Sequence, residues 1–533
     1  MKPEKLSDFI TVLAFTVLAT AHLAGCEQAA KTGSTVSTEV VPVQPVSACE
    51  ALAQTLISGT EINATTLVAS ENELPEYCRI EGVIEPGIGF EARFPTRSWN
   101  GKYYQAGCGG FCGVLSPDKP GYSNTINEAL KRGYAAIAVD GGHKGTSMGD
   151  ASWAKDNRQA EVVYAHTGVA LVHAAGTSMV EAFYKQETNR SYFSGCSTGG
   201  RMAVKTAQVY PDLFDGILAG GGVLNLSSSG GIYGSWIVST NLDEDGRQIL
   251  DYRFTLKIPL LTAAATEQCD SLDGMEDGII GAPQSCTMNV GEIPLCEGES
   301  TNQCLTALEA GVVSKWYQGP VNSTGEQLFP GIPPGSERYW PIWFLGTQER
   351  TGGGNLLGGL YVKYLGLEED SNESYSVSDF DFDNDPVRLE AMGKLYNAWD
   401  PDLRPFRSAG GKMIMYHGLA DPLVLPENSI RYYESVVTEM GNEIDIDDFL
   451  RFFTVPGMGH CWEMPANTPD QFDPITALEN WVEKGKAPAY MEAHALQPET
   501  ALSSRAALCP YPGAAVNLSI AQDASTACKT TSP

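Results

Sequence analysis

Ser197 is the residue whose neighbours most clearly predict chemistry in this chain of 533 residues. It stands in Gly-Cys-Ser-Thr-Gly, residues 195–199, between a β-rich run and a helical pattern. A sharp turn in that context lifts the hydroxyl above a sheet and directs a helix N-terminus at it, where developing negative charge is favoured. Glycines flank the serine because so tight a turn leaves no room for side chains. Ser197 is therefore the candidate nucleophile of an acyl-transfer reaction.

A serine hydroxyl needs a base, and on a sheet of this kind the order along the chain is serine, acid, histidine. His460 and His494 both come late enough, and the sequence favours His460 because it follows a strand-like run directly. Asp421 follows the preceding strand-like run and is expected to orient His460 and stabilise its cation. The alternatives are a structural role for His460 in its loop and an aspartate–proline turn at Asp421.

The oxyanion that acyl transfer creates needs two backbone N–H donors. Thr198, the residue after the nucleophile, should supply one of them. The other is expected from Gly109 or Gly110, in a glycine loop that follows an early strand-like run. Losing one such donor typically lowers the rate about 10²–10³-fold.

Cysteines adjoin both reacting residues: Cys196 precedes Ser197, and Cys461 follows His460. Catalysis would hold the serine oxygen and the imidazole about 3 Å apart, so their neighbours fall within disulfide reach. A bond between these cysteines would close 265 residues of chain. The chain-entropy model gives at most about 5–6 kcal/mol for a loop of that length. The alternative is two unrelated structural cysteines.

The elements that must position these residues are short strand-like runs alternating with helical patterns. Helical patterns cover residues 158–184 and begin again near 199. Alternation of this kind predicts an α/β fold with a mostly parallel sheet covered on both faces. Functional residues then lie at the carboxyl ends of strands. The strand-like runs are residues 102–106, 134–139, 191–194, 412–416 and 451–455.

The charge balance excludes some classes of partner. With 35 Lys and Arg against 65 Asp and Glu, the formal net charge is −30. Binding of nucleic acid or of anionic membrane surfaces requires a basic footprint, so neither is expected. No protein partner is implied. The content of 43% hydrophobic and 19% charged residues is typical of a folded chain.

The first 25 residues read as a signal peptide with a lipoprotein-type end. Lys2 and Lys5 precede a short apolar run, and residues 23–26 read Leu-Ala-Gly-Cys. Cys26 would then carry a lipid, residues 26–48 would form a tether, and the lipid would be the one membrane attachment. The chain is expected to be exported, as an outer-membrane lipoprotein or to the periplasm or the medium. The alternative is an ordinary signal peptide cut nearby.

Three motifs, in order, resemble those of the tannase and feruloyl esterase family. They are Gly-Cys-Ser-Thr-Gly-Gly at 195–200, Tyr-His-Gly at 416–418 with Asp-Pro at 421–422, and Gly-His-Cys at 459–461. The resemblance runs from about Cys49 to the C-terminus. It implies an α/β-hydrolase core with a large lid and a serine triad bridged by a disulfide. It also implies a small aromatic ester as substrate: a gallate, a hydroxycinnamate or mono(2-hydroxyethyl) terephthalate.

Spacing supports the lid independently, because 224 positions separate Ser197 from Asp421 and only 39 separate Asp421 from His460. The expected division is a first core part, a lid and a second core part, over residues 49–222, 223–400 and 401–533.

An acidic, glycine-punctuated stretch lies within the expected lid. It resembles the family's calcium loop, which implies a structural Ca²⁺ held by three side chains and two backbone carbonyls. The side chains are those of Asp270, Asp273 and Asp277, and the carbonyls are those of Met275 and Ile279. Read without the resemblance, the stretch is equally well a solvated acidic turn.

Twelve cysteines remain after Cys26, and an exported chain sits in a compartment where disulfides persist. Beyond the pair beside the triad, we expect Cys269–Cys286, Cys296–Cys304, Cys49–Cys78, Cys509–Cys528 and, as the remainder, Cys108–Cys112.

Four aromatic residues of the expected lid could stack on the ring of the acid, or could be ordinary lid core. They are Tyr339, Trp340, Trp343 and Phe344. Arg338 and Arg350 could bind a substrate carboxylate, although surface charge is the simpler reading. The leading hypothesis is a serine carboxylic ester hydrolase. The competing ones are a peptidase or thioesterase on the same fold and a catalytically silent lipoprotein that binds aromatic esters.

Overall fold

The computed structural model describes residues 44–119, 124–370, 374–441, 445–461, 468–496, 504–518 and 528. The predicted signal peptide, Cys26 and most of the tether lie outside the described residues. Within the described ranges, no helix is long and apolar enough to cross a membrane.

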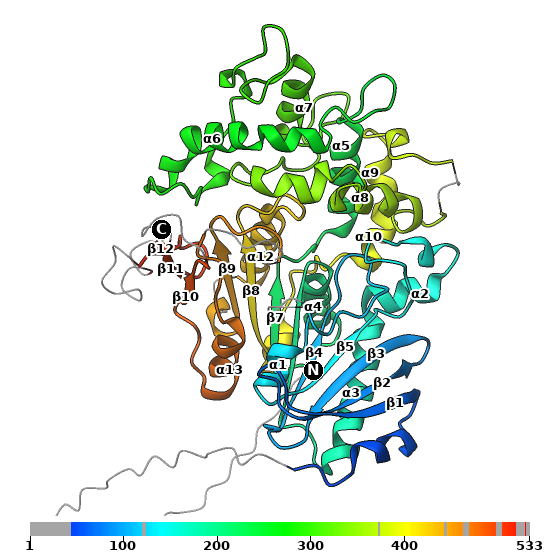
Figure 1. The fold of residues 1–533 in the computed structure, drawn as a ribbon. Coiled ribbons are helices and arrows are strands. Elements are labelled where there is room, and N and C mark those ends of the chain that lie inside the picture. Colours follow the sequence, from blue (N-terminus) through cyan, green and yellow to red (C-terminus); the bar gives the residue numbers. More distant parts are fainter. Residues whose placement is uncertain are drawn as a thin grey trace, which may run out of the picture. The chain divides into compact units, whose positions relative to one another are not determined.

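A nine-stranded sheet in the order β1-β2-β3-β5-β4-β6-β7-β8-β9 organises the chain (Figure 1). β4 to β9 run parallel, whereas β1, β2 and β3 form an antiparallel meander, and β3 pairs antiparallel with β5. All residues of β5 and β7 are buried, as expected for parallel strands covered on both faces. The strands are β1 Thr60–Val68, β2 Tyr77–Ile84, β3 Ile88–Pro95, β4 Lys102–Ala106, β5 Ala135–Val139, β6 Arg190–Cys196, β7 Gly216–Gly220, β8 Lys412–Gly418 and β9 Leu450–Val455.

Helices cover both faces of this sheet and bury two separate apolar clusters. One cluster packs α3, α4 and α12 against the sheet, and the other packs α1 and α13. The predicted helix over 158–184 is present but interrupted by a π-helical turn at Val163–Thr167. The helices are α1 Asn127–Lys131, α2 Arg158–Val162, α3 Gly168–Tyr184, α4 Thr198–Val209, α12 Pro426–Met440 and α13 Pro474–Lys484.

The chain between β7 and β8 is largely helical, and Figure 1 shows it in green and yellow beyond one end of the sheet; we call this segment the lid. This segment encloses the insertion expected at 223–400. Two buried tyrosines join it to the core: Tyr233 donates to the Pro422 carbonyl at 2.5 Å, and Tyr339 donates to that of Gly457 at 2.8 Å. The lid segment contains α5 Gly234–Ser239, α6 Ile258–Cys269, α7 Ala307–Gln318, α8 Gly353–Tyr364, α9 Asp385–Arg388, α10 Glu390–Tyr396 and α11 Arg404–Ser408.

The five predicted strands correspond to β4, β5, β6, β8 and β9, and the predicted α/β fold with a mostly parallel sheet is confirmed. The antiparallel meander was not predicted, nor was a small sheet of β10 Met491–His494, β11 Arg505–Leu508 and β12 Val516–Asn517. The structure also forms six disulfides, and they join the cysteines in the pairs expected from the sequence.

Candidate active site

Ser197 occupies a strained turn between β6 and α4, with φ 62° and ψ −123°. A non-glycine residue in such a region costs on the order of 1–3 kcal/mol and persists only where the surroundings enforce it. Here the Ser197 N–H donates to the Gly220 carbonyl at 3.0 Å, and the Ser197 carbonyl accepts from the amides of Arg201 and Val223. A Cβ on Gly195 would come within 2.5 Å of the Gly199 backbone, so the crossing of strand and helix requires glycine. The turn thus presents the hydroxyl at the carboxyl end of β6.

Asn124 holds this turn from the side, a contact that the sequence analysis missed. Its Nδ2 donates to the Cys196 carbonyl at 3.2 Å, and its Oδ1 accepts from the Cys196 amide at 3.3 Å. The side chain thereby pairs with the last residue of β6 as another strand would. No motif marks Asn124, since only the fold brings it to the turn.

His460 and Asp421 meet in the buried space beneath the lid. The His460 Nδ1 lies 2.6 Å from Asp421 Oδ2, and both side chains are almost fully buried. Burial by itself would raise the pKa of Asp421, but the charge of His460 and hydrogen bonds from His417 and His460 outweigh it and lower the pKa to about 2. Asp421 is therefore ionised at neutral pH, so it accepts the Nδ1 proton and leaves Nε2 of His460 as the basic nitrogen.

The second oxygen of Asp421 is fixed by the backbone. Its Oδ1 accepts from the amides of Leu423 at 2.9 Å and Val424 at 3.0 Å. His417 packs behind it, fully buried, with Nε2 at 2.8 Å from the Val424 carbonyl and 3.4 Å from Asp421 Oδ2. His417 is thus a residue packed behind the carboxylate. His494, the alternative base, is an exposed residue at the end of β10.

A disulfide joins the serine turn to the histidine loop. Cys196 and Cys461 are bonded, with their Cα atoms 5.9 Å apart. At Gly221 a Cβ would meet Cys196 Sγ at 3.2 Å, Cys461 Sγ at 3.6 Å and Asp421 Oδ2 at 3.8 Å. Three groups therefore converge at Gly221: the sulfur of Cys196 next to Ser197, the sulfur of Cys461 next to His460, and the carboxylate of Asp421.

A cavity of about 60 Å³ opens beside Ser197, between the core and the lid. Its wall is apolar apart from four hydroxyls, and none of the described residues that line it is charged. We call it the Ser197 cavity. It is lined by Gly110, Phe111, Ser197, Thr198, Val223, Leu226, Ser229, Gly230, Tyr233, Gly234, Ile237, Phe344, Gly354, Leu357, Gly358, Leu423 and Val424.

The candidate oxyanion donors differ in their position relative to this cavity. Thr198 is the first residue of α4, where helix amides have no partner one turn earlier, and it lines the cavity. Gly110 lines it as well. Gly109 is not among the residues that line it. The geometry therefore favours Gly110 over Gly109 as the second donor.

The four lid aromatics that the sequence grouped together have separate places. Phe344 lines the Ser197 cavity, and the ring of Trp343 stands edge-on to His460, with centroids 5.4 Å apart. Trp340 is fully buried against Trp316, as lid core. Tyr339 packs on the Gly459 backbone before His460. Arg338 and Arg350 are not among the residues that line the cavity.

The acidic stretch after α6 has the chemistry of a calcium site in part. A cavity of about 40 Å³ is lined by four of the five predicted ligands, those at 273, 275, 277 and 279. The fifth, Asp270, is buried and has an Oδ1 without a hydrogen-bond partner, an atom that a cation would satisfy. In the part of the chain that the structure describes, however, no three Asp, Glu, His or Cys side chains gather as metal ligands. The Asp270 oxygen without a partner is thus the observation that favours a cation here, whereas the three predicted side-chain ligands do not gather in the structure.

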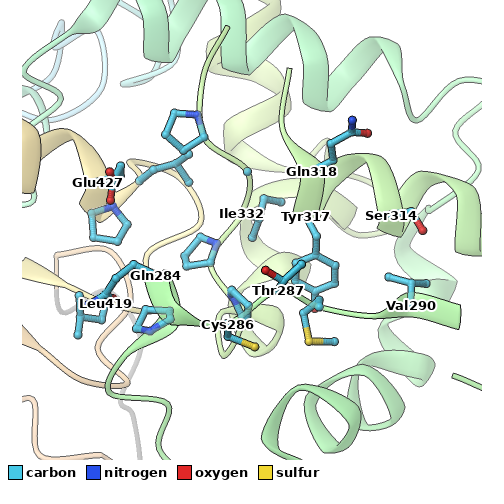
Figure 2. Close-up of a pocket in the computed structure, with 18 of the residues that line it drawn as sticks. Gln284, Cys286, Thr287, Val290, Ser314, Tyr317, Gln318, Ile332, Leu419 and Glu427 are labelled. Atoms are coloured by element: carbon cyan, nitrogen blue, oxygen red, sulfur yellow. The ribbon is translucent and has the colours of Figure 1, made fainter. Parts of the chain in front are cut away.

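A larger hollow of about 630 Å³ lies elsewhere between lid and core (Figure 2). Figure 2 shows Tyr317 and Ile332 on its lid side and Leu419 and Glu427 on its core side. Neither Ser197 nor His460 lines it. It is therefore separate from the candidate active site.

Comparison with known proteins adds independent findings. A family model described as tannase and feruloyl esterase matches residues 73–528. The chain is 31% identical to an uncharacterized esterase of Xanthomonas campestris, over 87% of this chain and 86% of that protein. It is 30% identical to a mono(2-hydroxyethyl) terephthalate hydrolase of Piscinibacter sakaiensis, over 89% of each. The crystal structure of feruloyl esterase B from Aspergillus oryzae matches with a TM-score of 0.73 at 25% identity, covering 88% of this chain and 96% of that one.

Proposed function

The chain belongs to the tannase and feruloyl esterase family and is a carboxylic ester hydrolase, and we propose that it cleaves esters of uncharged aromatic acids through an acyl-enzyme on Ser197. The observation that carries this proposal is the convergence at Gly221. The Asp421–His460 contact of 2.6 Å and the Cys196–Cys461 disulfide bring acid, base and serine turn together.

In the proposed acylation step, the Ser197 oxygen attacks the ester carbonyl while Nε2 of His460 takes the hydroxyl proton. The ionised Asp421 keeps the proton on Nδ1 and stabilises the imidazolium that forms. The carbonyl oxygen becomes an oxyanion and accepts hydrogen bonds from the amides of Thr198 and Gly110. When the tetrahedral intermediate collapses, His460 returns its proton to the leaving alcohol.

Hydrolysis of the acyl-enzyme repeats the same roles with water. Nε2 of His460 takes a proton from water, the hydroxide attacks the acyl carbonyl, and the released Ser197 oxygen regains its proton from His460. Trp343 stands edge-on against the ring of His460, which limits how the imidazole can turn between the two steps.

The Ser197 cavity argues for an uncharged acid part. Its wall offers Phe344 and apolar side chains to a flat ring. Of the two lid hydroxyls in this wall, Tyr233 donates to Pro422, whereas Ser229 accepts from Asn428 and can still donate one hydrogen bond. A carboxylate placed there would be buried without a cation, which costs several kcal/mol. Hydroxycinnamate or benzoate esters therefore fit better than a monoester of terephthalic acid.

The experiment is a panel of esters offered to the purified protein, with Ser197→Ala as control. Three neutral-acid esters test which aromatic acid is accepted: methyl ferulate, methyl gallate and chlorogenic acid. Monomethyl terephthalate and methyl 4-carbamoylbenzoate form a matched pair of similar shape that differ in one negative charge. We expect cleavage of at least one neutral aromatic ester, and a kcat/KM about 10²-fold lower for the charged member of the pair, equivalent to the cost of an unpaired carboxylate.

Two results would contradict the proposal. Full activity in Ser197→Ala would show that no acyl-enzyme forms on Ser197. Equal kcat/KM for the two matched esters would show that the cavity does not discriminate against a charged acid.

We also propose a structural Ca²⁺ in the loop after α6 and export of the chain. Asp273 and Asp277 would supply carboxylate oxygens to the ion, remote from the reaction. The expected result is a melting temperature that rises with Ca²⁺ in the wild type but not in Asp273→Asn. An unchanged wild-type melting temperature would contradict the site.

The proposal that the chain is exported rests on its disulfides. Six disulfides support an oxidising compartment. Mass spectrometry of the mature N-terminus tests whether it is a lipidated Cys26.

A further inference from the structure

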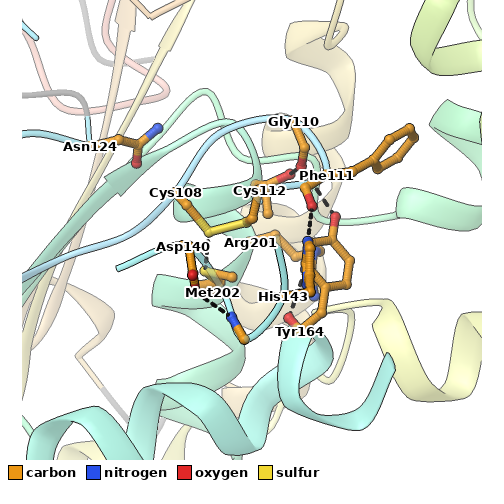
Figure 3. Close-up of a disulfide and its surroundings, with 12 residues drawn as sticks. Cys108, Gly110, Phe111, Cys112, Asn124, Asp140, His143, Tyr164, Arg201 and Met202 are labelled. Carbon is orange, nitrogen blue, oxygen red and sulfur yellow. Dashed lines mark hydrogen bonds between the residues drawn. A yellow bond between two sulfur atoms is a disulfide. The ribbon is translucent and has the colours of Figure 1, made fainter. Parts of the chain in front are cut away.

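The loop after β4 carries a second disulfide (Figure 3), and two residues between its cysteines line the Ser197 cavity. Cys108 and Cys112 are bonded across only four positions, and both are buried. Between them lie Gly110 and Phe111, which line the cavity beside Ser197. The disulfide therefore closes the short segment that forms one part of the core side of the cavity.

The hydrogen bonds of this segment fix the direction of one amide. The Cys112 N–H donates to the Gly109 carbonyl at 2.9 Å, which closes a turn. In a trans peptide the carbonyl of one residue and the N–H of the next point in opposite directions. Because the Gly109 carbonyl points toward Cys112, the Gly110 N–H points away from it. The disulfide bridges the same turn, so it restrains the peptide plane that carries the candidate oxyanion donor.

The next peptide planes are held by side chains, as Figure 3 shows. The Gly110 carbonyl accepts from the Thr198 hydroxyl at 2.6 Å and from the Tyr164 hydroxyl at 3.3 Å. The Phe111 carbonyl lies 2.7 Å from Nε2 of His143. Burial lowers the pKa of His143 to about 4, so the ring is neutral and Nε2 is the donor. These bonds hold the end of the loop that leads to Cys112. Directly before Cys108, the Gly107 amide donates to the Ser194 carbonyl at 2.8 Å, so the disulfide ties two held ends together across the glycines.

Chain entropy does not account for this disulfide. A bond across four positions restricts the unfolded chain much less than one across 265. The bond also has costs in the fold: Cys112 takes a left-handed φ of 60°, and Gly141 must lack a Cβ, which would lie 2.6 Å from Cys112 Cβ. A costly bond with a small effect on the unfolded chain points to a role in shaping the loop.

We propose that the Cys108–Cys112 disulfide is a positioning element for ester hydrolysis, which holds the Gly110 amide toward the oxyanion formed at Ser197. This inference rests on the proposed acyl-enzyme mechanism. Without the bond, the Gly109–Gly110 peptide can rotate, because two adjacent glycines impose little restriction on the backbone. The donor is then lost for part of the time, and transition-state stabilisation falls while substrate binding in the apolar cavity does not.

The test compares the full chain with Cys108→Ser/Cys112→Ser. A second variant, Cys108→Ser/Cys112→Gly, removes the bond and also relieves the left-handed conformation, so it keeps the test informative if the first folds poorly. The control is Cys296→Ser/Cys304→Ser, which removes another short disulfide, spanning eight positions in the lid. All variants are first compared by circular dichroism and thermal melting.

We expect kcat for a neutral aromatic ester to fall about 10²-fold in both loop variants, with KM within about twofold, as for the loss of one oxyanion donor. A readout that a merely structural role would not move is the inhibition constant of a trifluoromethyl ketone, which forms a tetrahedral adduct. This constant should rise in parallel with the loss of kcat/KM, while binding of the product acid stays unchanged. The lid control should match the wild type in all three measurements.

Folded loop variants with wild-type kcat, or with a loss confined to KM, would overturn the proposal. Unfolding of both loop variants would also overturn it, because the bond would then be required for the fold. A failure of the underlying mechanism is distinguishable, since Ser197→Ala would then retain the activity of the wild type.

Discussion

The two sides of the Ser197 cavity are built in different ways. On the core side, backbone groups are held by hydrogen bonds, left-handed residues and two disulfides, so that Ser197 and Gly110 have fixed orientations. On the lid side, apolar side chains and glycines of α5 and α8 pack closely, with Gly234 and Gly358 in backbone contact. The difference indicates that the core side determines the reaction and the lid side determines which acid is accepted.

The largest effect is expected at Asp421, where the core side holds the base. Asp421→Asn keeps the shape but presents an amide to Nδ1 of His460, which favours the wrong tautomer. We expect kcat to fall about 10⁴-fold with little change in KM. The matched control is Asp402→Asn, a half-buried surface residue paired with Arg404. A loss of less than tenfold would show that Asp421 does not orient the base.

The disulfide beside the triad should affect stability and activity together. Cys196→Ala/Cys461→Ala releases a loop of 265 positions, and we expect a loss of about 3–5 kcal/mol in the free energy of unfolding. The measurement is denaturant unfolding followed by circular dichroism, with kcat determined on the fraction that remains folded. Unchanged stability and unchanged kcat in this variant would show that the disulfide does not hold the core side rigid, which would contradict the difference drawn between core side and lid side.

Asn124→Ala tests the side-chain clamp on the serine turn. The substitution removes both hydrogen bonds to the Cys196 backbone, so the strained turn loses lateral support. We expect kcat to fall about tenfold, consistent with a loss of roughly 1.4 kcal/mol, and KM to stay within twofold. Steady-state kinetics on methyl ferulate and p-nitrophenyl acetate check this. A change in KM for ferulate alone would place Asn124 with the lid side instead.

The smallest effect is expected on the lid side, and it should depend on the substrate. A Cβ at Gly358 would lie 2.8 Å from the Gly234 Cα, so Gly358→Ala separates α5 from α8 at the cavity wall. We expect KM for an aromatic ester to change about threefold to tenfold and the hydrolysis of p-nitrophenyl acetate to stay the same. Gly359→Ala on the same helix is the control, because a Cβ there meets open space. Equal effects on both substrates would argue against a lid role in selecting the acid.

The Asp421–His460 contact and the Cys196–Cys461 disulfide were predicted from the sequence because they depend on local motifs. A turn between strand and helix requires the glycines around Ser197. Because Ser197 and His460 must lie close together, the cysteines next to them were expected to be within disulfide reach. The order of serine, acid and histidine then left few candidates for each role.

On the lid side the sequence named Phe344 among four candidate aromatic residues but could not assign their separate places, because these depend on packing between segments without motifs. Nothing in the run of aromatic residues distinguished Trp340, which is buried against Trp316, from Trp343, which faces His460. Asn124 escaped notice for the same reason, since its partner Cys196 lies 72 positions away in the chain. The antiparallel meander was also missed, although its strands complete one edge of the sheet.

The central claim, that Ser197 attacks the ester, is tested most directly by covalent labelling. The full-length protein is treated with a fluorophosphonate, digested and analysed by mass spectrometry, beside Ser197→Ala and Cys296→Ser/Cys304→Ser. The account predicts one adduct, on Ser197, whose formation parallels the loss of esterase activity, with the same result in the lid disulfide variant and no adduct in Ser197→Ala. An active enzyme that is labelled elsewhere, or that loses activity without a Ser197 adduct, would contradict it.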